Sequence, residues 1–226
     1  MLNEIKKAVK RAAPNAFLAP QGPEGIAKSG HRKYVGGLWE EMGQHQLDFL
    51  ISRGMEPQHR LLDVACGSLR LGVVAIPYLN AGHYLGIEKE EMLIEAGLKE
   101  ELPKGLADEK SPKFVISSEF EFSKFGVQAD YGIAQSLFSH LTPEVIDLCF
   151  ERLLPAMAPG GKFYGTYFRS DGTFKNPRVS HDHGIFKYTE DEMIGFGTRA
   201  GFETTYIGDW GHPRNQVVTE YRRPLA

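Results

Sequence analysis

Short apolar runs alternate with amphipathic stretches along most of the chain. Runs with strand character fall at 60–65, 83–88, 113–117, 129–135, 161–168, 202–208 and 215–222. Helical periodicity fills most of the gaps, at 69–80, 90–101, 143–157 and 189–200, and predicts one earlier helix at 38–53. Because strands and helices alternate, we expect a parallel sheet covered by helices on both faces.

The last two strands break this alternation. Residues 209–214 join them without a helix, which predicts an antiparallel hairpin. The expected fold class is therefore α/β, a doubly wound Rossmann-like sheet of seven strands, mostly parallel, with a C-terminal antiparallel hairpin.

Two segments lie outside this regular pattern. Residues 1–37 are predicted to form an N-terminal helix and a lid or linker, because 2–13 is a basic amphipathic stretch and 14–37 is rich in proline and glycine. The 2–13 stretch suits either a surface helix packed on its own domain or docking to an anionic surface. Residues 38–226 form a single domain, with an insertion at about 169–187 that suits contacts to a substrate.

The composition limits the kinds of partner that the protein is expected to bind. The net charge of −3 and the lack of a basic stripe argue against a nucleic-acid partner. No apolar run reaches the roughly 18 residues of a membrane-spanning helix, so no integral membrane segment is expected. The two cysteines, Cys66 and Cys149, lie in apolar runs, which favours a cytoplasmic protein. The oligomeric state stays open, with a homodimer as one option.

The most informative motif follows the first strand of the sheet. Asp63-Val64-Ala65-Cys66-Gly67-Ser68 reads as a strand end and a turn of small residues, and the next strand ends on Glu88. Small residues let a ligand approach the backbone, and a carboxylate can accept hydrogen bonds from ribose hydroxyls. This order of residues predicts a nucleotide-binding crevice.

Several motifs together resemble the class I S-adenosylmethionine-dependent methyltransferases over roughly residues 34–222. The matching segments are Asp63 to Gly67, Glu88, Ser118 to Phe120, Gln135 to Leu141 and Leu154 to Phe163. More narrowly, Val35-Gly36-Gly37 and Gly208 to Arg214 resemble a small bacterial subgroup whose acceptor is undefined. The resemblance implies S-adenosylmethionine as cofactor. Pro159 and the two glycines after it are expected to end a helix and turn the chain into the fifth strand.

The same resemblance implies a set of cofactor-binding residues. Asp63 and the loop around Gly67 face the methionine part, Glu88 accepts both ribose hydroxyls, and Glu119 with Phe120 holds the adenine. The full implied set is Tyr34, Gly37, Asp63, Ala65, Cys66, Gly67, Ser68, Glu88, Lys89, Glu119, Phe120, Gln135 and Ser136. Glu119 is also consistent with a solvated loop acid.

The glycine loop departs from the family pattern at two of three positions. Ala65 replaces the first glycine and Leu69 the third, so that Leu69 is expected to belong to the following helix. A strand–turn–helix that binds no ligand is the alternative to a cofactor loop.

Three histidines are candidates for the catalytic base, because the pKa of histidine lies near working pH. His140 follows the fourth strand, and His181 and His183 lie in the insertion. For His140, capping of the next helix is the alternative role. His181-Asp182-His183 is a weak metal signal, and no metal is expected.

Aromatic and basic residues flank the expected crevice at both ends of the chain. Tyr34, Trp39 and His31 suit a lid hinged at Gly36 and Gly37, with core filling as the alternative for Trp39. Trp210, His212 and Arg214 on the closing hairpin are expected to be structural and to lie away from the crevice.

We expect methyl transfer to a small-molecule acceptor, a hydroxyl rather than an amine. The Asn/Asp-Pro-Pro-aromatic signature of many amine-directed enzymes is absent, since that position reads Gln135-Ser136-Leu137-Phe138. Sugars, glycolipids or natural products are acceptors by analogy. Three alternatives stay open: an N-methyltransferase, a non-catalytic cofactor-binding scaffold, and a nicotinamide-dependent oxidoreductase.

Overall fold

The computed structural model describes residues 19–225. The expected basic helix at 2–13 lies outside the described residues. Within 19–225, no helix is long and apolar enough to cross a membrane.

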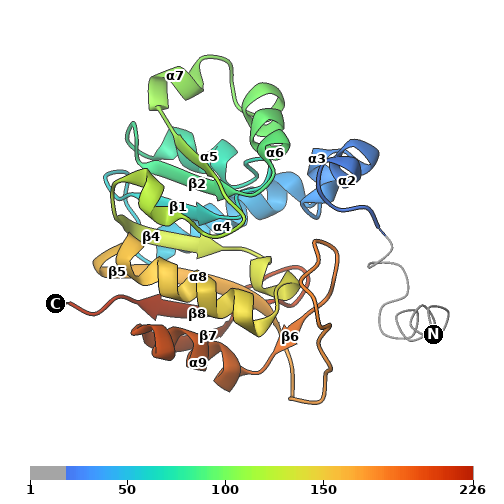
Figure 1. Cartoon of the computed structure of the whole chain (residues 1–226). Coiled ribbons are helices and arrows are strands. Elements are labelled where there is room, and N and C mark those ends of the chain that lie inside the picture. The colour runs from blue at the N-terminus through green and yellow to red at the C-terminus, as the bar shows by residue number, and fades with distance from the viewer. Residues whose placement is uncertain (1–18, 226) are drawn as a thin grey trace.

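One mixed sheet forms the centre of the molecule (Figure 1). Its strands are β1 Leu61–Val64, β2 Tyr84–Glu88, β3 Lys113–Ile116, β4 Ala129–Ala134, β5 Met157–Arg169, β6 Lys187–Tyr188, β7 Glu203–Asp209 and β8 Val217–Arg222. The order is β3-β2-β1-β4-β5-β8-β7, and β6 pairs with β5 beside this path. The predicted Rossmann-like α/β fold is confirmed. The predicted number of seven strands misses β6, a two-residue strand inside the insertion.

The position of β1 fixes where a ligand can bind. β1 pairs in parallel with both β2 and β4, so that Asp63 lies opposite Gly86 on one side and Ile133 on the other. The chain reverses its direction of winding between these neighbours, which opens a crevice at the carboxyl ends of the strands. Only β8 runs antiparallel to β5, and β7 pairs with β8 as the predicted hairpin.

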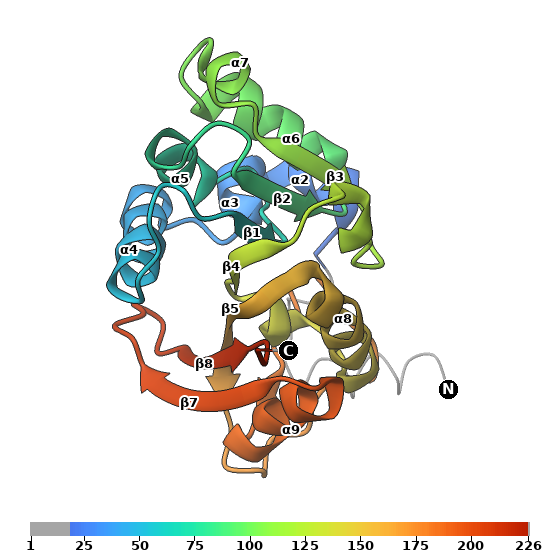
Figure 2. The ribbon, with the colours of Figure 1, turned by 90° about the vertical axis from the view of Figure 1, so that its left-hand side faces the viewer.

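Helices cover both faces of the sheet (Figure 2). The helices are α2 Gly22–Ser29, α3 His31–Tyr34, α4 Trp39–Ser52, α5 Gly72–Tyr78, α6 Glu91–Ala96, α7 Leu106–Lys110, α8 Pro143–Ala156 and α9 Glu190–Ala200. Neighbouring residues of β1 point to opposite faces, so Leu61 packs in the apolar cluster under α4 and α5, and Leu62 packs in the cluster that includes α8.

Several helix boundaries differ from the sequence pattern. Residues 97–101 continue α6 as one wider π-helical turn, and α7 interrupts a stretch that shows no helical periodicity. Pro159 does not end a helix, because α8 stops at Ala156 and Pro159 already belongs to β5. The pairing of β4 with β5 shifts register between Ala129 and Tyr131, which accommodates this irregular start.

The proline- and glycine-rich segment before α4 is more regular than expected. Part of it forms α2 and α3, with Gly30 between them at a φ of 78°. The turn at Gly36 and Gly37 then leads into α4, and both glycines have positive φ. Figure 1 shows α2 and α3 beside α6, at the end of the sheet where β1 and β2 finish. This two-helix segment, residues 21–37, is called the lid below.

Candidate functional site

A cavity of about 730 Å³ lies at the carboxyl ends of β1, β2 and β4. Its size is typical of small-molecule sites, roughly 300–1,000 Å³. The lid and the insertion line it together with the strand ends, and so does the turn before β8.

Three residues of the loop after β1 hold left-handed backbone conformations. The φ angles are 58° at Ala65, 55° at Gly67 and 67° at Leu69. Leu69 therefore does not begin the helix as expected; α5 begins at Gly72. A side chain at positive φ costs about 1–2 kcal/mol per residue, and such strain concentrates at functional sites. The loop thus keeps the shape of a three-glycine loop although two of the glycines are replaced.

The packing of the lid explains why position 67 is a glycine. A Cβ atom there would lie 2.8 Å from Cγ1 of Val35, a lid residue. The absence of a side chain therefore lets the lid pack directly on the loop.

The Glu88 carboxylate is held by the backbone at the end of β2. Oε2 accepts a hydrogen bond from the Gly67 N–H at 3.0 Å, and Oε1 accepts from the N–H groups of Lys89 at 2.8 Å and Glu90 at 3.2 Å. Burial raises the pKa of Glu88, and these three donors oppose the shift. A carboxylate has about four acceptor positions, and these donors occupy three of them.

Asp63 is buried at the end of β1, with 4% of its surface exposed. It accepts a hydrogen bond from the Tyr84 hydroxyl at 2.6 Å. Burial raises the pKa of Asp63 to about 6, although the Tyr84 hydrogen bond and the charge of Arg70 both lower it. Asp63 therefore holds a negative charge at neutral pH that responds to mild acid.

Arg70 ties the lid to the strand ends. Its guanidinium donates to the carbonyl oxygens of Val35 at 3.2 Å and Gly37 at 2.8 Å, and to Oε1 of Gln135. Arg214, from the turn before β8, donates to the carbonyl of Gly36 at 2.6 Å. Two arginines thus hold three successive lid carbonyls. The sequence motifs gave no signal for either role, because the partners are backbone oxygens.

The lid also contacts the insertion. The Tyr34 hydroxyl donates to Asp182, and Nζ of Lys89 lies 2.5 Å from the other oxygen of that carboxylate. The backbone N–H of Asp182 donates to Gln21 at 3.0 Å. Burial raises the pKa of Asp182, but the hydrogen bonds from Lys89 and Tyr34 outweigh it, and the pKa lies below its usual range.

The three candidate histidines all line the cavity. His140 lies at the end of the 3-10 helix Leu137–His140, and its Nδ1 is 2.7 Å from the carbonyl of Gly184. A carbonyl can only accept, so Nδ1 carries the proton and Nε2 has the lone pair. Burial lowers the pKa of His140, which keeps the ring neutral at pH 7.

The insertion is fastened along that 3-10 helix. The N–H of His181 donates to the carbonyl of His140 at 3.0 Å, and the N–H of Phe186 donates to that of Ser139 at 2.9 Å. The rings of His181 and His183 are 6.0 Å apart, and burial lowers the pKa of His181. In the described part of the chain, no group of three or more His, Cys, Asp or Glu side chains is placed to hold a metal ion.

The turn between β7 and β8 is placed differently from the sequence expectation. His212 and Arg214 line the cavity, so the expectation that they lie away from the crevice is wrong. The turn folds back over the end of β4, which brings Nε2 of His212 within 3.1 Å of Nε2 of Gln135. Trp210 instead packs against Phe49, at a ring distance of 5.1 Å, in the core under α4.

Thirteen residues of the predicted site line the cavity, and three do not. Those that line it are Tyr34, Asp63, Ala65, Cys66, Gly67, Glu88, Lys89, Phe120, Gln135, Ser136, His140, His181 and His183. Gly37 and Ser68 lie outside the lining. Glu119 projects from the surface with its side chain 69% exposed, 3.6 Å from Arg152. Ser117 and Ser118 line the cavity beside Phe120 instead.

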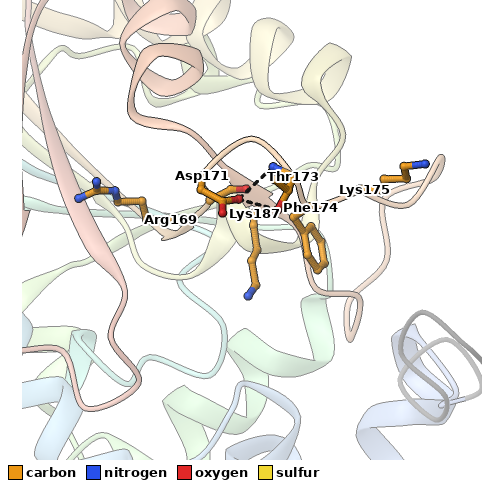
Figure 3. A pocket seen from close by; sticks show the side chains of 7 residues that line it. Arg169, Asp171, Thr173, Phe174, Lys175 and Lys187 are labelled. Atoms are coloured by element: carbon orange, nitrogen blue, oxygen red, sulfur yellow. Dashed lines mark hydrogen bonds between the residues drawn. The ribbon is translucent and has the colours of Figure 1, made fainter.

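A second hollow of about 590 Å³ lies in the insertion (Figure 3). The basic side chains of Arg169, Lys175 and Lys187 border it, and Asp171 accepts hydrogen bonds from the backbone and hydroxyl of Thr173. In Figure 3 these side chains spread apart rather than converge. This open hollow offers no enclosed site.

Comparison with solved structures shows the fold. No protein-family model matches the chain. A magnesium protoporphyrin IX methyltransferase from Synechocystis with bound S-adenosylmethionine superposes with a TM-score of 0.61 at 12% identity, covering 98% of this chain and 96% of that one. An amino pentose methyltransferase from Micromonospora echinaspora gives a TM-score of 0.60 at 16% identity, covering 87% and 96%. Human N-acetylserotonin methyltransferase gives 0.68 at 14%, covering 99% and 66%.

The acceptors named for these three proteins are a porphyrin, an amino sugar and an acylated amine. Such different acceptors on one fold mean that the fold does not specify the acceptor. The chain has the fold of the S-adenosylmethionine-dependent methyltransferases.

Proposed function

We propose that the protein transfers a methyl group from S-adenosylmethionine to a small-molecule acceptor, and that the methylated atom is a hydroxyl oxygen. The observation that carries this proposal is the Glu88 carboxylate, fixed by the Gly67 N–H inside a cavity of suitable size. The match in fold to proteins that bind this cofactor supports it.

The lining residues fit the cofactor. Glu88 has an acceptor position for a ribose hydroxyl, and Phe120 offers an apolar surface to the adenine. The buried charge of Asp63 suits the cationic methionine end. When bound, S-adenosylmethionine supplies a methyl group that is already activated, because its transfer leaves a neutral thioether. The chain therefore has to align the acceptor and exclude water.

The residues around His140 provide the proton acceptor that a hydroxyl needs. With Nδ1–H donating to the carbonyl of Gly184, Nε2 is the basic atom of a ring that lines the cavity. Nε2 takes the hydroxyl proton as the oxygen–methyl bond forms. The hydrogen bond between Tyr34 and Asp182, called the latch below, joins the lid to the insertion beside the same cavity.

Binding of the cofactor product tests the proposal first. We expect S-adenosylhomocysteine to raise the melting temperature and to bind in calorimetry, and NAD to do neither. Labelled methyl transfer from S-adenosylmethionine to hydroxyl and amine acceptors follows. Transfer to amines alone would contradict the hydroxyl assignment. Cofactor binding with no transfer to any acceptor would favour a non-catalytic scaffold.

A further inference from the structure

Hydrogen-bond donors gather at one corner of the cavity, where the turn before β8 passes over the end of β4. This donor corner consists of Arg70, Gln135, His212 and Arg214, all of which line the cavity. The orientation of the Gln135 amide is fixed, because Oε1 accepts from Arg70, a residue without any acceptor atom. Its NH₂ group therefore faces His212, with the two nitrogens 3.1 Å apart.

The proton on His212 is placed by its neighbour. The backbone N–H of Arg214 lies 3.0 Å from Nδ1 and can only donate, so Nδ1 accepts and Nε2 carries the hydrogen. Burial, followed by the positive fields of His45, Arg70 and Arg214, lowers the pKa of His212 to about 4, which agrees with a neutral ring.

Two N–H groups consequently face each other. One hydrogen of the Gln135 NH₂ goes to Oγ of Ser136 at 2.6 Å, and the other faces the Nε2–H of His212, which it cannot satisfy although His212 is only 5% exposed. A buried donor without an acceptor costs about 1–3 kcal/mol. An oxygen that carries negative charge would accept from both.

The charges at the donor corner also favour a negatively charged oxygen of a ligand. Among residues 19–225, neither Arg70 nor Arg214 has a carboxylate within ion-pair distance; their hydrogen bonds go to lid carbonyls and to Gln135. The acid whose field reaches Arg70 is Asp63, and burial nevertheless lowers the pKa of Arg70 to about 10. The guanidinium groups keep further N–H donors for a ligand.

A buried acceptor lies in the same cavity. Gln46 of α4 is 3% exposed, and its Oε1 has no hydrogen-bond partner within the described residues. A hydroxyl group of the ligand would satisfy it. The donors and this acceptor together suit a molecule that carries both a carboxylate and hydroxyl groups.

We propose that the donor corner binds the carboxylate of the methyl acceptor, and that the acceptor is a hydroxylated carboxylic acid. The inference rests on the proposed function. The methionine end of the cofactor also carries a carboxylate, so both the acceptor and the cofactor offer this group to the donor corner. We assign the corner to the acceptor because Ser136, the neighbour of Gln135, is hydrogen-bonded to Thr166 of β5 and to Gln216 just before β8. The corner therefore lies on that side of the sheet, whereas Glu88 lies on β2.

Calorimetry on the protein saturated with S-adenosylhomocysteine tests this inference. The probes are matched pairs, glucuronate against glucuronamide and para-hydroxybenzoate against para-hydroxybenzamide. In at least one pair, the acid is expected to bind about tenfold or more tightly than its amide, since hydrogen bonds to a charged group are the stronger ones.

Two variants distinguish binding of the acceptor's carboxylate from binding of the cofactor's carboxylate. His212→Asn keeps a side-chain acceptor for the Arg214 N–H but lacks the Nε2–H donor, and Arg214→Gln removes the charge. We expect both variants to abolish the preference for the acid, and His212→Asn to change the affinity for S-adenosylhomocysteine by less than about twofold. Arg214→Gln also removes a hydrogen bond to the lid carbonyl of Gly36, so its affinity for S-adenosylhomocysteine does not enter this comparison. His59→Gln, which lies outside the cavity lining, is the matched control and should keep the preference.

Three results would overturn the inference. In the first, no acid binds the saturated protein better than its amide. In the second, acids are preferred equally by the wild type and by both variants. In the third, His212→Asn loses affinity for S-adenosylhomocysteine, which would assign the corner to the cofactor's carboxylate. Absence of S-adenosylhomocysteine binding to the wild type would overturn the proposed function itself, and this inference with it.

Discussion

The Tyr34 hydroxyl donates a hydrogen bond to the carboxylate of Asp182, 148 residues further along the chain. The same hydroxyl accepts from the N–H of Gly22 at 2.7 Å. Lys89, next to Glu88, pairs with the other oxygen of Asp182. The lid, the insertion and the end of β2 therefore meet at one carboxylate beside the cavity. Movement of the lid would change the contacts of Asp182 and Lys89 as well as those of Tyr34.

Tyr34→Phe should loosen the lid. Loss of a hydrogen bond to a charged group is expected to lower the free energy of unfolding by about 1 kcal/mol and to speed release of S-adenosylhomocysteine several-fold. Stopped-flow release kinetics and hydrogen exchange of residues 22–34 measure the two effects. Tyr78→Phe is the control, because Tyr78 donates to the carbonyl of Met55 away from the cavity. Equal release rates in both variants would contradict a latch.

Glu88→Gln should weaken binding of S-adenosylhomocysteine by about 1–3 kcal/mol. The carboxylate accepts three backbone N–H groups, and an amide would turn its own NH₂ against at least one of them. Calorimetry compares this variant with Glu119→Gln, whose side chain is 69% exposed and should leave affinity unchanged. Unchanged affinity in Glu88→Gln would remove this residue from the cofactor site.

Asp63 predicts a pH dependence of stability. Its pKa is about 6 in the folded protein and about 4 when unfolded, so the folded state binds the proton more tightly between these values. Stability therefore falls as pH rises from about 4 to 6, by an amount on the order of 2–3 kcal/mol from this group alone. Asp63→Asn should remove that slope in denaturant titrations at pH 4.5 and 7.

The same group predicts how pH affects the cofactor. An ionised Asp63 attracts the positive methionine end, so affinity for S-adenosylmethionine should decrease as pH falls through about 6. The Asp63→Asn protein should bind more weakly at pH 7 and show little change with pH. If the variant kept the wild-type pH profile, another group would carry the dependence.

The sheet could be predicted closely because its signals are local. Apolar runs of strand length and the Thr189–Glu192 capping box, which the structure contains, specify their elements without help from the rest of the chain. β6 was missed for the opposite reason. Its two residues become a strand only through pairing with Phe168 and Arg169 of β5.

The cavity could be predicted most directly where side chains stand at the ends of strands. Asp63 and Glu88 do so, and the alternating pattern places them. The placement of Gln46, Arg70 and His212 depends on how α4 and the last turn pack over the sheet, and a residue pattern does not encode such tertiary contacts. Glu119 failed to line the cavity because the loop turns at Phe120, which has a φ of 56° and points inward in its place.

His140→Gln tests the base. Removal of a general base is expected to lower kcat by about 10²–10⁴-fold and to leave S-adenosylhomocysteine affinity within about twofold. Burial lowers the pKa of His140, so the wild-type rate should be constant near pH 7 and fall only in acid, as Nε2 gains a proton. The variant should lose this acid limb, since glutamine does not titrate. His59→Gln should behave as wild type, and a His140→Gln profile that retained the limb would assign the base to His181 or His183.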